Sequence, residues 1–139
     1  MSIHITAPLG MIMALALVAC QSGAPQQGSA PAATAETDAL VAGTNYHATG
    51  DIECTIGADA ATGMCPFGVI REGNGSGSVI VTKPDGRTRA IFFADGAATG
   101  YDVSEADPGE FSATRDGDDT IVFIGAERYV VPDAVIFGG

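Results

Sequence analysis

Glycine placed between short apolar runs is the feature that most constrains the fold of this chain. Residues 46–139 contain 15 glycines in 94 positions, separated by short segments rich in valine, isoleucine and phenylalanine. Glycine destabilises helix interiors, and no segment has the 3.6-residue apolar period of an amphipathic helix. Short β-type runs between turn residues are instead typical of an all-β domain. We therefore expect a small antiparallel meander, sandwich or open barrel, and the pattern does not distinguish among the three.

Two turn sequences predict hairpins, Lys83-Pro-Asp-Gly86 and Arg115-Asp-Gly-Asp118. In the first, proline presets φ and glycine accepts a positive φ, as hairpin turns require. The runs that these turns join are 78–82 with 89–93 and 111–114 with 120–124. Further strands are expected at 51–56, 66–71, 128–131 and 133–137. Pro132 cannot donate to a ladder, which predicts a bend before the last strand. The glycine-rich stretch 73–77 is expected to be a mobile loop.

The aromatic residues mark the extent of the domain. All nine lie between Tyr46 and Phe137, and a core needs large apolar side chains. Residues 46–139 are therefore expected to form one small domain. A domain of this size buries roughly 60–65% of its unfolded surface, which is enough to fold alone with a narrow margin.

The residues before the domain have the pattern of an export signal. Residues 7–19 form an uncharged, mostly apolar run, which fits the core of a secretory signal and is short for a membrane-spanning helix. The run ends in Leu17-Val-Ala-Cys20, which resembles the lipobox of bacterial lipoproteins. That resemblance implies a signal peptide at 1–19, cleavage after Ala19, and a lipid anchor such as palmitate on Cys20.

The residues on either side of this apolar run indicate how the protein is exported and where it is localised. The first ten residues contain no Lys or Arg, although export signals normally begin with positive charge, so we expect inefficient export or a different start. Gln21 resembles the residue of lipoproteins sent to the outer membrane, because Asp there favours the inner membrane. Residues 20–45 carry too few large apolar side chains to fold. We expect them to be a lipidated, disordered linker that holds the domain on the periplasmic side.

The charge balance excludes several classes of partner. Six Lys and Arg stand against 17 Asp and Glu, a formal net charge of −11. Nucleic acid requires a basic patch, so we expect no nucleic-acid partner. The acidity also opposes electrostatic adhesion to anionic lipid headgroups. Its main expected role is solubility, with a cationic partner as the alternative.

The two cysteines of the domain predict a structural disulfide. Cys54 and Cys65 remain as an even pair in an oxidising compartment once Cys20 carries lipid. Joining them closes a loop of about a dozen residues, for which the chain-entropy relation gives roughly 3 kcal/mol. They lack C-x-x-C spacing and a basic neighbour that would stabilise a thiolate, so a redox role is not favoured.

Sequence motifs for catalysis and cofactors are missing. There is no G-x-S-x-G sequence, no P-loop and no complete G-x-G-x-x-G, so we expect no catalytic residue and no cofactor. His47, the one histidine after the signal, is expected to be exposed or satisfied by hydrogen bonds. Calcium prefers oxygen ligands such as those at 116–119 or at Asp102, Glu105 and Asp107. Their spacing does not match an EF-hand, and Asp and Gly are common in turns, so no metal site is expected.

Arg87 and Arg89 lie two residues apart, so on a strand they would share a face with Ile91 and Phe93. A basic and apolar stripe of this kind could bind an anionic sugar or peptide group. Pairing of both arginines with surface carboxylates is the favoured alternative. If the domain binds a ligand, Arg87, Arg89, Phe93 and the stretch 73–77 are the predicted surface.

Several stretches of the domain resemble a group of small exported proteobacterial proteins of unknown function. They are Tyr46-His-Ala-Thr-Gly50, Cys54…Cys65-Pro-Phe-Gly-Val69, Lys83-Pro-Asp-Gly-Arg87, Arg89-Ala-Ile-Phe-Phe93 and Glu127-Arg-Tyr129…Ile136-Phe-Gly-Gly139. The resemblance covers most of residues 46–139 and implies no activity. It favours a non-catalytic, lipid-anchored envelope module with a structural role or one that binds a protein, peptide or glycan. A periplasmic enzyme or inhibitor that uses His47 or residues 102–107 is the alternative.

Overall fold

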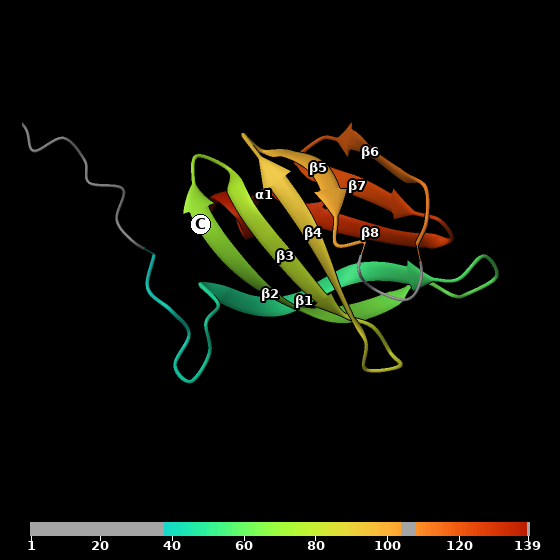
Figure 1. The fold of residues 1–139 in the computed structure, drawn as a ribbon, viewed down its shortest axis with the longest axis horizontal. Coiled ribbons are helices and arrows are strands. Elements are labelled where there is room, and N and C mark those ends of the chain that lie inside the picture. The colour runs from blue at the N-terminus through green and yellow to red at the C-terminus, as the bar shows by residue number, and fades with distance from the viewer. Residues whose placement is uncertain (1–37, 104–107, 139) are drawn as a thin grey trace, which may run out of the picture. The chain divides into compact units, whose positions relative to one another are not determined.

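The computed structural model describes residues 38–103 and 108–138. The expected signal, Cys20 and the linker as far as residue 37 lie outside the described residues. In the described part, eight antiparallel strands form one sheet that curls into a nearly closed barrel (Figure 1). The all-β expectation is therefore confirmed. The elements are β1 Ala48–Ile56, β2 Gly63–Gly73, β3 Ser76–Thr82, β4 Thr88–Ala94, β5 Ala97–Tyr101, β6 Phe111–Asp116, β7 Asp119–Ile124, β8 Glu127–Pro132 and α1 Asp133–Phe137.

The barrel consists of two meanders. Strands β1 to β5 follow one another across the sheet, and so do β6 to β8, which gives the order β5-β4-β3-β2-β1-β8-β7-β6. Both predicted hairpins are confirmed, as β3–β4 and β6–β7. The meanders join where β1 pairs with β8, at Cys54↔Tyr129, Thr55↔Arg128 and Ile56↔Glu127. We call this boundary the β1–β8 junction.

The second boundary between the meanders lies between β5 and β6, the two edges of the sheet. We call it the β5–β6 seam. No backbone ladder joins these two strands within residues 38–103 and 108–138. The sequence does not predict strand β5, because Ala97-Ala-Thr-Gly-Tyr101 contains no valine, isoleucine or phenylalanine, whereas each of the other strands contains at least one.

The core lies inside the barrel, because successive side chains of a strand point to opposite faces. On β3 the buried positions include Val79 and Val81, and on β4 they are Arg89, Ile91 and Phe93. The outward positions between them are partly or fully exposed. A charged side chain therefore occupies an inward position of the same strand as two core residues.

The predicted disulfide between Cys54 and Cys65 is confirmed. It links β1 to β2 with a Cα–Cα distance of 5.8 Å, and both residues are buried. Cys54 is also the residue that pairs with Tyr129 of β8. The disulfide therefore lies beside the β1–β8 junction, where it links β2 to the strand of the first meander that pairs with β8.

The expected last strand is wrong, because residues 133–137 form the short helix α1. Val135 and Ile136 are both buried, and neighbouring residues of a strand would face opposite sides. The helix packs against β2, β3 and β8 and covers one end of the barrel. Arg71 of β2 holds it there: Nε donates to the Val135 carbonyl at 2.8 Å, and Nη2 donates to the Ala134 carbonyl at 3.3 Å.

The expected mobile loop at 73–77 is also wrong. β2 and β3 continue to Gly73 and Ser76, so that only Asn74 and Gly75 form the turn. Their φ angles are 53° and 72°, the conformation of a tight hairpin turn in which both central residues have positive φ. Space is limited as well, because a Cβ on Gly75 would lie 2.6 Å from the ring of Phe137. This stretch is a packed hairpin under α1.

The residues that lead into β1 are held against the barrel. The Thr44 hydroxyl donates to the Val41 carbonyl at 2.9 Å, and the Val41 amide donates to the Tyr46 carbonyl at 2.7 Å. Asp38 forms an ion pair with Arg71. The same arginine therefore binds both the segment before β1 and the helix α1. No helix in the described ranges is long and apolar enough to cross a membrane.

Candidate functional site

Glu127 is the centre of a buried polar cluster inside the barrel. Its Oε1 accepts hydrogen bonds from Lys83 Nζ at 3.1 Å and from Arg89 Nη2 at 3.0 Å. Its Oε2 accepts from Arg89 Nε at 2.9 Å and from the Tyr129 hydroxyl at 2.9 Å. We call Lys83, Arg89, Glu127 and Tyr129 the Glu127 cluster.

The cluster connects the two meanders through the interior. Lys83 follows β3 and Arg89 belongs to β4, whereas Glu127 and Tyr129 belong to β8. Arg89 is fully buried and Lys83 is 3% exposed. Arg89 uses two nitrogens on the two carboxylate oxygens, the strongest and most directional arrangement of this ion pair. The cluster therefore connects β4 with β8, which are not neighbours in the sheet, through direct side-chain contacts.

The electrostatics of the cluster stabilise its charged state. Burial alone would raise the pKa of Glu127, but hydrogen bonds from Arg89, Tyr129 and Lys83 outweigh it, and the pKa lies below the usual 4.5. The hydrogen bond to Glu127 raises the pKa of Arg89. Burial and the neighbouring carboxylate raise the pKa of Tyr129 far above its usual value. Around neutral pH the carboxylate is therefore ionised, and the Tyr129 hydroxyl remains its hydrogen-bond donor.

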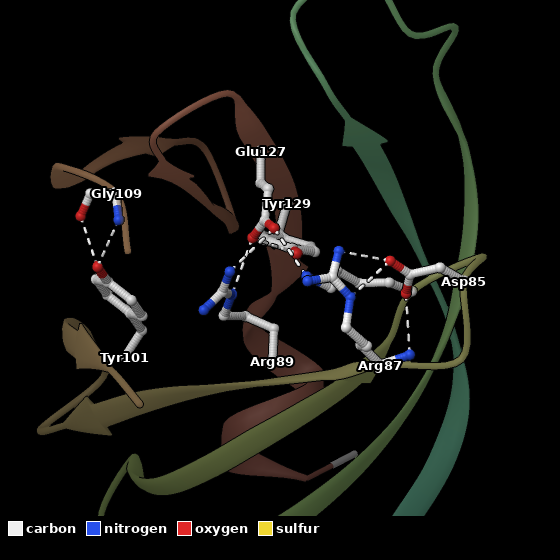
Figure 2. A network of polar contacts seen from close by, with 8 residues as sticks. Asp85, Arg87, Arg89, Tyr101, Gly109, Glu127 and Tyr129 are labelled. Atoms are coloured by element: carbon white, nitrogen blue, oxygen red, sulfur yellow. Dashed lines mark hydrogen bonds and ion pairs between the residues drawn. The ribbon is translucent and has the colours of Figure 1, made fainter. Parts of the chain in front are cut away.

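Tyr101 extends this network from the interior to the β5–β6 seam. Its ring centroid lies 5.2 Å from the guanidinium carbon of Arg89, within the range of a cation–π contact. Its hydroxyl donates to the Gly109 carbonyl at 2.6 Å and accepts from the Gly109 amide at 2.8 Å. Figure 2 shows Arg89 between Glu127 and Tyr101, with Gly109 beyond the Tyr101 hydroxyl. Tyr101 thus connects the end of β5 to the chain before β6, where the described residues form no backbone ladder.

Glycine is required at position 109 for this bridge. A Cβ there would lie 2.5 Å from the backbone nitrogen of Gly125, closer than real Cβ contacts. The absence of a side chain lets the chain before β6 lie directly on the β7–β8 turn. That close approach places the Gly109 backbone where the Tyr101 hydroxyl can reach both of its polar groups.

The expectation that Arg87, Arg89 and Phe93 lie together on one exposed binding face is wrong. Arg89 is fully buried and Phe93 is 6% exposed, and both belong to the interior. Arg87 precedes β4 and lies outside, where its Nη2 is 2.7 Å from Asp85 Oδ2. This contact lowers the pKa of Asp85. The favoured alternative, pairing of the arginines with surface carboxylates, is confirmed for Arg87 and is wrong for Arg89, because its carboxylate partner Glu127 is buried.

His47 has a structural contact in the barrel wall. Its Nδ1 accepts a hydrogen bond from the Arg71 amide at 2.9 Å, and its own amide donates to the Val69 carbonyl at 2.8 Å. The expectation that hydrogen bonds satisfy His47 is confirmed for Nδ1. Of the alternative acidic region at 102–107, residues 104–107 lie outside the described residues.

The acidic stretch 116–119 forms a turn, as predicted. Asp116 pairs with Asp119 across the β6–β7 hairpin, and Gly117 takes a φ of 60°. Arg115 binds Asp133 through both Asp133 oxygens, at 2.5 and 2.7 Å, which lowers the pKa of Asp133. In the described parts of the chain, no group of three or more His, Cys, Asp or Glu side chains is placed to hold a metal ion.

Sequence reasoning missed that Lys83, Glu127 and Tyr129 form a buried cluster with Arg89. The two-residue period of the strands does contain a signal for this cluster. Arg89 shares its face with Ile91 and Phe93, and Glu127 shares its face with Tyr129 and Val131. Charged residues of opposite sign, each in phase with core residues on its own strand, predict a buried ion pair.

Comparison of the chain with protein-family models, with curated proteins and with solved structures gives no match.

Proposed function

We propose that the chain is a lipid-anchored protein of the bacterial cell envelope whose barrel is a non-catalytic binding module. The observation that carries the non-catalytic part is the Glu127 cluster. The charged side chains of the barrel interior bind one another and connect the two meanders, so that their chemistry maintains the fold. The proposed ligand is a protein, peptide or glycan of the envelope.

The anchor part of the proposal rests on the sequence Leu17-Val-Ala-Cys20 at the end of an apolar run. Cys20 would carry lipid that includes palmitate, and Gln21 favours the outer membrane, with the barrel facing the periplasm. A short tether of low apolar content would hold the barrel away from the bilayer.

The anchor is tested by growing cells that express the full chain with labelled palmitate. The wild type should incorporate label and sediment with the outer membrane. Cys20→Ser should incorporate none and leave the membrane fraction, and its barrel should melt at the same temperature as that of the wild type. Membrane association of unlabelled Cys20→Ser would contradict the anchor.

The non-catalytic role is tested by following the Glu127 carboxyl carbon and the Tyr129 ring by NMR over pH. Neither signal should titrate between about pH 5 and 9, because one pKa is lowered and the other is raised. Titration of either residue within this range would support acid–base chemistry at the cluster and overturn the proposal.

A further inference from the structure

The β5–β6 seam is where the barrel wall lacks backbone pairing among the described residues. Edge strands present unpaired N–H and C=O groups, which makes them templates for another strand. In β6 the strand register shows which main-chain groups face β7 and which face the seam. The two-residue turn makes Asp116 and Asp119 a hydrogen-bonded pair, and the Glu110 carbonyl also faces β7, because it accepts from the Gly125 amide at 2.9 Å. The main-chain N–H and C=O groups of the even-numbered residues of β6 therefore form the hydrogen bonds to β7.

The odd-numbered residues of β6 consequently direct their main-chain groups toward the seam. They are Phe111, Ala113 and Arg115. Gly109 continues the same row, and the Tyr101 hydroxyl binds both of its main-chain groups. Tyr101 thus occupies the first position of a row in which the next three residues have no ladder to β5 within the described chain.

A second observation at the seam concerns the core. Elsewhere the inward apolar side chains are mostly buried, but Ala98 and Tyr101 of β5 and Phe111 and Ala113 of β6 are only partly buried. The outward side chains beside them on β6 are small and exposed, and they belong to a serine and a threonine at 112 and 114. Among the described residues, the seam therefore combines an available strand edge, incompletely covered apolar groups and small outward side chains on β6.

The charge near the seam selects the chemistry of an added strand. Glu110, Asp116 and Asp118 are exposed at the two ends of β6, and the chain as a whole carries a formal charge of −11. The nearby cation Arg115 is bound to Asp133. A strand with basic outward residues would therefore be attracted.

We propose that the β6 edge of the β5–β6 seam binds an extended peptide segment by strand addition. The segment alternates apolar residues, which cover Ala98 and Ala113, with Lys or Arg, which face the acidic surface. Main-chain bonds to Phe111, Ala113 and Arg115 supply register, and the alternating side chains supply specificity. The inference rests on the proposed binding function and names its site and ligand class.

The test uses the full chain in detergent and a nine-residue peptide in which valine alternates with lysine. One matched peptide has the same composition in scrambled order, and another has N-methyl groups on the amides of alternate residues, in both possible phases. We expect the alternating peptide to bind and the scrambled peptide to bind at least about tenfold more weakly. One N-methyl phase should lose about a hundredfold in affinity, because its bonds to the edge are removed.

Hydrogen exchange locates the peptide. Binding should slow exchange of the Phe111, Ala113 and Arg115 amides. Ala113→Pro, which removes an amide that faces the seam and not β7, should abolish binding; melting and circular dichroism establish whether this variant is folded, and the N-methyl peptides test the same bonds if it is not. Equal binding of scrambled and alternating peptides, or protection confined to another face, would overturn the proposal.

Two further outcomes separate the inference from the proposed function. Self-association of the chain that protects the seam and that the peptide does not reverse would assign the edge to a second copy and overturn the peptide proposal. Mass spectrometry of the peptide after incubation should recover it intact. Cleavage of a peptide that binds at the seam would contradict the non-catalytic function while the binding site stands.

Discussion

The two boundaries between the meanders are built differently. At the β1–β8 junction, three residue pairs form a backbone ladder, the Cys54–Cys65 disulfide lies behind it, and the Glu127 cluster crosses the interior from β8. At the β5–β6 seam, the Tyr101 side chain replaces the ladder. Closing a sheet joins strands that are distant in sequence. In this protein, buried covalent and ionic contacts lie at one closure. Among the described residues, the other is held by side-chain contacts of Tyr101, namely its two hydrogen bonds to Gly109 and its stacking on Phe111.

The largest test of this difference is Glu127→Gln. Glutamine keeps the shape of the side chain but removes the negative charge shared by Lys83 and Arg89. Breaking a buried ion pair on one side costs about 3–5 kcal/mol, and we expect a loss of that order in the free energy of unfolding measured with urea. A loss below about 1 kcal/mol would mean that the cluster does not brace the meanders.

The comparison of the wild type with Glu127→Gln also predicts how stability responds to acid. Because the pKa of Glu127 is lower in the folded protein than the usual 4.5, its contribution to stability is complete above that value and is lost as pH falls through the folded pKa. The difference in stability between wild type and Glu127→Gln should therefore be constant from neutral pH to about pH 5 and shrink below about pH 4.5. Urea titrations at stepped pH measure it, and a difference that grows in acid would reverse the assignment.

Next in size is the double change Cys54→Ala with Cys65→Ala. The bridge spans a sequence separation of 11, and the chain-entropy relation predicts a loss of about 3 kcal/mol. Hydrogen exchange should quicken first at β1 and in the loop 57–62. Equal unfolding curves for the oxidised wild type and the double variant would remove the disulfide from the explanation of the β1–β8 junction.

Tyr101→Phe tests the seam itself. The ring and its stacking on Phe111, with centroids 6.2 Å apart, are retained, whereas both hydrogen bonds to Gly109 are lost. We expect about 1–2 kcal/mol of destabilisation, with faster amide exchange confined to residues 109–115. Faster exchange at β8 instead would show that the two boundaries are not independent.

The smallest expected effect is that of Glu53→Gln, a control on the outer side of the β1–β8 junction. Glu53 of β1 binds Arg128 of β8 at 2.6 Å, but both side chains are substantially exposed. An exposed pair contributes under about 1 kcal/mol. The contrast with Glu127→Gln at the same junction isolates the effect of burial, and a similar loss in both variants would erase it.

The parts of this fold that sequence could predict are local. The turn 83–86, the turn at 116–119 and the proximity of Cys54 to Cys65 follow from short-range chemistry, and each is present. Closure of the sheet depends on β1 meeting β8 across most of the domain, which no local pattern encodes. For the same reason sequence could not decide between sandwich and barrel.

The errors at the last strand and at Arg89 have a common physical cause, which is packing between distant parts of the chain. The β-branched residues of 133–137 favour a strand, but packing over the barrel end buries Val135 and Ile136 together, which only a helical turn allows. The strand period places Arg89 on one face with Ile91 and Phe93, but the period alone does not tell whether that face is inside or outside the barrel. Its carboxylate partner, Glu127, is 38 residues away, and long-range neutralisation of this kind is invisible in a local window.

Arg71 connects the residues that lead into the barrel with the helix that follows the last strand. Its guanidinium binds Asp38, where the chain enters, and the Ala134 and Val135 carbonyls of the closing helix. If the chain is held at Cys20, a pull on the tether reaches Arg71 before it reaches β1. The load would then spread to β2 and to the helix over the barrel end, and the hydrogen bonds of the first strand would be shielded from tension.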